Sequence, residues 1–106
     1  MSVDRCVWVG LVGVGPLPTN TNLDGAKGAY VNALALASNV EDFQQAVRIA
    51  LDQLALFAFE FEDVELFDNR SERMKLDKDL YALAHEVRQA GAVRFGEFHR
   101  FAALDG

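Results

Sequence analysis

The side chains best suited to chemistry are carboxylates that crowd into one short stretch: Glu60, Glu62, Asp63, Glu65 and Asp68. A carboxylate pair can supply a general acid and a general base only where two different environments separate their pKa values. Nothing in the sequence indicates a pocket that would do this. We therefore interpret the group either as the wet face of a strand or as a docking surface for a basic protein partner.

Other reactive residues lack the companions that their chemistry requires. A zinc site needs three or four ligands, whereas His85, His99 and the single Cys6 stand far apart. Ser38 and Ser71 have no base at a recognisable spacing, which nucleophilic catalysis requires. The sequence thus predicts no catalytic residue, no metal site and no cofactor.

Three glycines near the N-terminus, Gly10, Gly13 and Gly15, resemble a phosphate-binding loop in a different order. Their spacing is G-x-x-G-x-G, and Pro16 and Pro18 follow where such a loop needs a helix N-terminus. We interpret them as strand glycines beside a bulge or a close neighbour. The segment from Gly15 to Gly28 is then a long loop, a length typical of mobile or functional loops.

Length and charge limit the classes of function. The 106 residues, 51% of them hydrophobic, predict one domain spanning 1–106 with a real core. A net charge of −6 argues against a nucleic-acid partner and allows a basic protein. The uncharged run from Cys6 to Leu23 is interrupted by glycine and proline and shows no export cleavage pattern, so we expect a cytoplasmic protein without membrane contact.

Two amphipathic helices are expected, over about 39–55 and 78–90. The first can begin with a capping box of Ser38 and Glu41, or one residue later with Asn39 and Asp42. Asp77 can cap the second helix and Gly91 can end it. A short extra strand over 73–76 remains an option in the charged connector between them.

The carboxylates are expected on a strand over 57–66. Phe57, Phe59 and Phe61 alternate with polar or small residues, but the next apolar residues fall on the other phase, so we predict a bulge at Glu62-Asp63. Further strands are expected over 7–12, 30–37 and 93–101. The residues predicted to be largely buried are Phe43, Val47, Leu51, Leu54, Phe59, Phe61, Leu80, Leu83 and Val87.

The element order predicts an α+β fold. We expect a two-layer sandwich, ferredoxin-like or related, with two helices on one face of a four- to five-stranded mixed sheet. The second and third strands would pair in parallel through a right-handed crossover. The apolar residues Trp8, Val12, Leu34 and Leu36 would then leave one face bare, so we expect a homodimer through that face.

Two segments carry a resemblance to a known group of proteins. The run ALASNVEDFQQAV from Ala35 to Val47 and the run FEDVEL from Phe61 to Leu66, with the phenylalanine-rich strand, resemble small acidic immunity proteins of bacterial toxin systems over about a third of the chain. The resemblance implies a protein that binds and blocks a toxin, often through an acidic surface. The alternative hypothesis is a small dimeric ligand-binding or enzymatic domain with a pocket near Trp8 and Tyr30.

Overall fold

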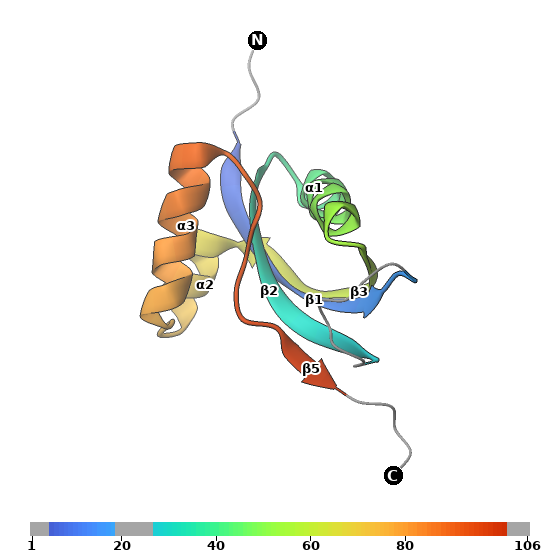
Figure 1. Cartoon of the computed structure of the whole chain (residues 1–106). Helices are drawn as coiled ribbons and strands as arrows, with labels where there is room; N and C mark the ends of the chain where they lie inside the picture. The colour runs from blue at the N-terminus through green and yellow to red at the C-terminus, as the bar shows by residue number, and fades with distance from the viewer. Residues whose placement is uncertain (1–4, 19–26, 102–106) are drawn as a thin grey trace.

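The computed structural model describes residues 5–18 and 27–101. In chain order the elements are β1 (Cys6–Pro16), β2 (Gly28–Ala37), α1 (Val40–Gln53), β3 (Leu56–Leu66), α2 (Phe67–Arg73), α3 (Lys78–Ala90), β4 (Arg94–Phe95) and β5 (His99–Phe101) (Figure 1). The fold is α+β, with an open antiparallel sheet. Most of the predicted Gly15–Gly28 loop lies outside the described residues, and its two ends belong to β1 and β2.

The sheet order is β3-β1-β2-β4, and β5 also pairs with β2. Every pairing is antiparallel, so the expectation of a mixed sheet is wrong. β2 and β3 do run in the same direction, as a helical crossover requires, because both are antiparallel to β1. However, they lie on either side of β1 and do not pair with each other.

Helices cover both faces of the sheet. On one face Val12, Val14 and Val31 pack against Phe43 and Val47 of α1. The alternate residues of the same strands point to the other face, where they pack against α2 and α3. This second hydrophobic cluster contains Val7, Val9, Leu34, Phe67, Ala84 and Val87. Figure 1 shows α1 on one side of the sheet and α2 with α3 on the other. The expected placement of both helices on one face is therefore wrong.

This arrangement removes the basis for the expected bare face. Val12 and Leu34 have no exposed surface, and Leu36 packs against the second cluster. The Trp8 indole N–H donates to the carbonyl of Ala37 at 3.0 Å, on the α1 side of the sheet. These residues thus contribute to the core of a single subunit.

The predicted helices begin and end close to their expected positions. Of the two possible caps of α1, the later one is present: the Asn39 side chain accepts from the Asp42 N–H at 2.8 Å. Ala55, just beyond the helix, takes a positive φ of 57°, which explains an end without glycine. Gly91 ends α3 at φ 74°, as predicted.

The charged connector folds into the unpredicted helix α2. Phe67 begins it and is buried, with its ring edge-on to Tyr81 at 5.5 Å between centroids. Because α2 extends to Arg73, the optional strand over 73–76 is absent. No helix in the described part of the chain has the length and apolar character needed to cross a bilayer.

Candidate functional site

Two irregularities in β3 decide where its side chains point. Val9 pairs with Glu65 and Leu11 with Glu62, so β3 contains one extra residue there. Asp63 accommodates it at φ 52°, and the predicted bulge is confirmed. A second shift, which we did not predict, adds a residue at Phe59, between the pairs Gly13–Glu60 and Val14–Ala58.

The second bulge overturns one burial prediction. Phe59 is 46% exposed, not buried. The extra residue changes the alternation of side chains along β3, so the Phe59 ring lies on the sheet face away from α1. Phe61 then faces α1 and packs edge-on to Phe43. Leu54, at the C-terminal end of α1, is 37% exposed and was also predicted wrongly.

The glycines of β1 make room for the exposed aromatic rings. A Cβ atom on Gly13 would lie 2.6 Å from the Phe59 ring, and one on Gly15 would lie 2.7 Å from the Phe57 ring. Both distances are too short for real contacts, so glycine is required if the rings stay in place. This confirms the interpretation of close neighbours over that of a phosphate loop.

Two of the acidic residues, Glu60 and Glu62, lie beside Tyr30, whose ring contacts Phe59. The Tyr30 hydroxyl donates to the Glu60 carboxylate at 2.9 Å, and the Tyr30 ring meets Phe59 edge-on at 6.0 Å. A hydrogen bond with Glu60, and the charge of Glu60, raise the pKa of Glu62. Asp63, the residue that follows Glu62, is also exposed. We call Tyr30, Phe57, Phe59, Glu60 and Glu62 the aromatic–acidic surface.

Within the described residues, neither Glu60 nor Glu62 forms an ion pair. The hydrogen bond from the Tyr30 hydroxyl to Glu60 is the main cause of the raised pKa of Tyr30, because loss of the phenol proton would place two negative charges together. The aromatic–acidic surface therefore carries negative charge that no cation of the described chain balances.

The other two acidic residues already have cationic partners. Glu65 accepts from Arg70 Nε at 2.8 Å and from Arg73 Nη1 at 2.6 Å, and these arginines lower the pKa of Glu65 to about 2. Asp68 lies 3.3 Å from Arg88 Nη2. The structure thus divides the predicted acidic group into an unpaired part and an internally paired part.

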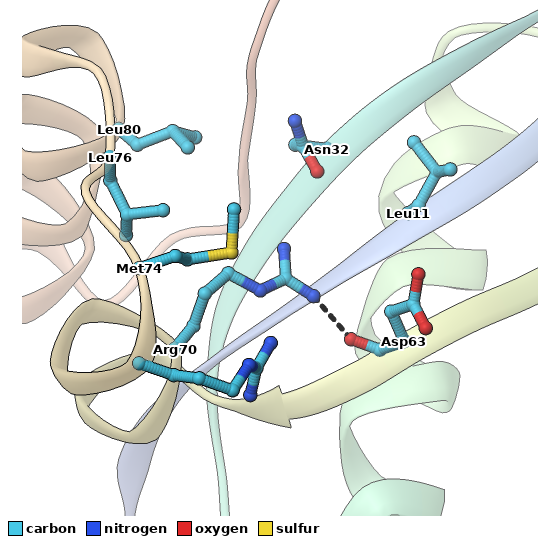
Figure 2. Close-up of a pocket in the computed structure, with 8 residues that line it drawn as sticks. Leu11, Asn32, Asp63, Arg70, Met74, Leu76 and Leu80 are labelled. Atoms are coloured by element: carbon cyan, nitrogen blue, oxygen red, sulfur yellow. Dashed lines mark hydrogen bonds between the residues drawn. The ribbon is translucent and has the colours of Figure 1, made fainter.

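A pocket of about 350 Å³ lies on the same sheet face, against the connection between α2 and α3. Figure 2 shows side chains from the sheet and from the helices meeting across it. Its lining comprises Leu11, Asn32, Asp63, Arg70, Arg73, Met74, Leu76 and Leu80. The expected pocket near both Trp8 and Tyr30 is absent from the described residues, because these two side chains lie on opposite faces of the sheet.

The remaining candidates stay apart. In the described part of the chain, no three residues of the His, Cys, Asp or Glu types are placed to hold a metal. His85, His99 and Cys6 are exposed, while the Ser71 hydroxyl donates to the Asp68 carbonyl at 3.0 Å. Asn32 and His99 do line a second, smaller pocket of about 160 Å³, without Tyr30.

Comparisons with protein-family models, with curated proteins and with solved structures found no match for this chain. The site is therefore interpreted from its own geometry.

Proposed function

We propose that this protein is a binding module that recognises a basic protein partner through the aromatic–acidic surface and catalyses no reaction. The observation that carries the proposal is the pair Glu60 and Glu62, which lie close enough for Glu60 to raise the pKa of Glu62 and which form no ion pair within the described residues. An arginine or lysine of a partner placed between them would relieve the repulsion that raises the pKa of Glu62.

The exposed rings support the same kind of partner. Phe57 and Phe59 are 47% and 46% exposed and lie on a sheet, which holds them more rigidly than a loop would. A guanidinium or ammonium group is attracted to an aromatic face, and its aliphatic stem adds apolar contact. Aromatic residues are also common among those that dominate binding energy at interfaces.

We assign the contact to Glu60 and Glu62, with Asp63 at the edge of the surface. Glu65 and Asp68, which the sequence also suggested for partner binding, are held by arginines of α2 and α3. A partner would have to displace those arginines before it could use either carboxylate.

The biological setting that we propose is neutralisation of a toxin in the bacterial cytoplasm, by occlusion of the toxin surface. The resemblance of the Ala35–Val47 and Phe61–Leu66 segments to immunity proteins supports this setting, as does the net charge of −6. We also propose a relationship to ferredoxin-like folds, limited to β2, α1 and β3. Two parallel strands joined by a helix across a central strand form the split unit of those folds.

The test begins with capture of a partner from the host and measurement of its association rate. The Glu60→Gln/Glu62→Gln double variant should associate several-fold more slowly at low salt and lose most of the salt dependence. The control is Glu41→Gln/Glu72→Gln, which removes two charges from exposed helical positions. Equal rates for the two double variants would show that only net charge matters and would refute this surface.

A second candidate function, binding of a small ligand, is favoured by the pocket that Arg70 lines.

A further inference from the structure

We infer that the pocket between the sheet and the α2–α3 connection binds a small organic carboxylate with an apolar body, and that Arg70 holds the carboxylate. The site is separate from the aromatic–acidic surface, although both lie on the sheet face away from α1. The chemical class of the ligand follows from the state of Arg70, from the local charge and from the pocket walls.

Arg70 is fixed in place before any ligand arrives. Its side chain is only 10% exposed. Nε donates to the Glu65 carboxylate at 2.8 Å, and Nη2 donates to the backbone carbonyl of Asp63, the bond drawn in Figure 2. A guanidinium held at two of its nitrogens keeps the third in a defined direction, which reduces the entropy lost on binding.

That third nitrogen, Nη1 of Arg70, is free to bind a ligand. It has no hydrogen-bond partner among the described residues, whereas no fully buried side-chain nitrogen or oxygen there lacks one. Nη1 must therefore be accessible, and Arg70 lines the pocket. A carboxylate is the acceptor that gains most from this donor, because a charge-assisted hydrogen bond is about twice as strong as a neutral one.

The local charge favours one additional anion. Arg70 and Arg73 both bind Glu65, so two positive charges face one negative charge. The competing group is the Asp63 carboxylate, which is exposed and points away from Arg70 in Figure 2. The charge of Asp63 acts on Arg73, so Arg70 is the guanidinium with a donor left for a ligand. One monocarboxylate at Nη1 suits this site, whereas a dianion would add excess negative charge beside Asp63 and Glu65.

The walls of the pocket require an apolar body. Leu11, Met74, Leu76 and Leu80 contribute hydrocarbon surface, and the Asn32 amide is the one uncharged polar side chain among the lining residues. The volume of about 350 Å³ lies near the lower end of the range for ligand sites, roughly 300–1,000 Å³. A free phosphate would leave this apolar wall unused, so we place a short-chain or aromatic monocarboxylate here.

The test uses hexanoate as the probe, with hexan-1-ol as the matched ligand without a charge, in NMR titrations of the full chain. Hexanoate should shift the backbone amides of Leu11, Asn32 and Met74. Hexan-1-ol should bind about tenfold more weakly or worse, because it cannot form the charge-assisted bond. Equal affinity of the two probes, or hexanoate shifts only at other residues, would overturn the inference.

Variants at Met74 test the pocket without removing a side chain that the fold requires. Met74 is 49% exposed, so its substitution leaves the core intact, whereas loss of Arg70 would leave Glu65 without its most buried partner. Met74→Glu places a carboxylate at the pocket and should weaken hexanoate binding about tenfold relative to Met74→Gln, which has the same shape without the charge. If the two variants bind hexanoate equally well, the probe does not occupy this pocket.

Discussion

Replacement of Glu65 by glutamine should destabilise the protein, whereas the same replacement at Glu62 should not. Both residues lie on β3 and lose the same charge. Glu65 accepts hydrogen bonds from Arg70 and Arg73, whereas the charged neighbours of Glu62 are the carboxylates of Glu60 and Asp63. The pair therefore separates the effect of a structural ion pair from the effect of net charge.

The magnitude follows from the pKa of Glu65, which falls from 4.5 to about 2. A tenfold change in an acid dissociation constant corresponds to about 1.4 kcal/mol, so the ionised form gains at most about 3 kcal/mol on folding. Arg73 is 58% exposed, and solvent screening reduces its share. We expect Glu65→Gln to lower the free energy of unfolding by about 2 kcal/mol at pH 7, a shift of about 1 M in the urea midpoint.

The loss should depend on pH in one direction. Because the pKa of Glu65 is lower in the folded state, its contribution is complete above the unfolded value of 4.5 and disappears as pH falls toward about 2. Urea unfolding followed by Trp8 fluorescence should therefore show the two proteins converging between about pH 5 and pH 2. Glu62→Gln should be at least as stable as the parent at pH 7, because the raised pKa of Glu62 means that the fold disfavours its charge.

The reasoning would be refuted by a Glu65→Gln protein as stable as the parent at pH 7. It would also be refuted by a stability difference that stays constant down to pH 3. Either result would mean that the arginines of α2 gain as much from water as from Glu65.

Two further predictions concern stability. Phe59→Ala should cost less than about 2 kcal/mol in urea unfolding, below the roughly 3–5 kcal/mol typical of a buried phenylalanine, because the ring is 46% exposed; a full core-like loss would contradict the second bulge. Gly91→Ala should lower the free energy of unfolding by about 1 kcal/mol, because alanine is strained at a φ of 74°. A steric clash does not contribute, since nothing lies within 4 Å of the new Cβ. Unchanged stability there would mean that the end of α3 relaxes at no cost.

Local signals in the sequence predicted the two longer helices, α1 and α3, well. Gly91 and the apolar stripe place α3 at its observed position, since both act within one helix. The N-terminal cap of α1 is one of the two alternatives that the sequence offered, Asn39 with Asp42. Helical periodicity shows that one side of α1 is buried, but it does not show which face of the sheet receives it. That choice depends on contacts between distant segments, and it is where the prediction of helix placement failed.

The bulge at Phe59 shows why burial in β3 was harder to predict. The alternation of Phe57, Phe59 and Phe61 is typical of a regular strand. The ring of Phe59 can lie over the sheet only because Gly13, on another strand, has no Cβ atom. The relevant signal was thus present in β1, but nothing in the sequence connects it to β3.

The acidic group was predicted as one surface and is divided by residues of α2. Glu62 and Glu65 are equivalent in a strand pattern, yet Arg70 and Arg73 reach only Glu65. The short helix α2 has too few residues for a periodic signal. Phe67 and Arg70 anchor it through burial and the ion pair with Glu65, and both contacts depend on the folded sheet.

The position of β3 at the end of the strand order also bears on self-association. An outer strand presents unpaired backbone groups, and a long flat one is a template on which further chains can assemble into fibrils. β3 spans 11 residues, but the irregularities at Phe59 and Asp63 interrupt its flat edge. The two distortions, of which the one at Phe59 also exposes the aromatic rings, therefore hinder edge-to-edge aggregation, and a substitution that straightened β3 would increase the risk of fibril formation.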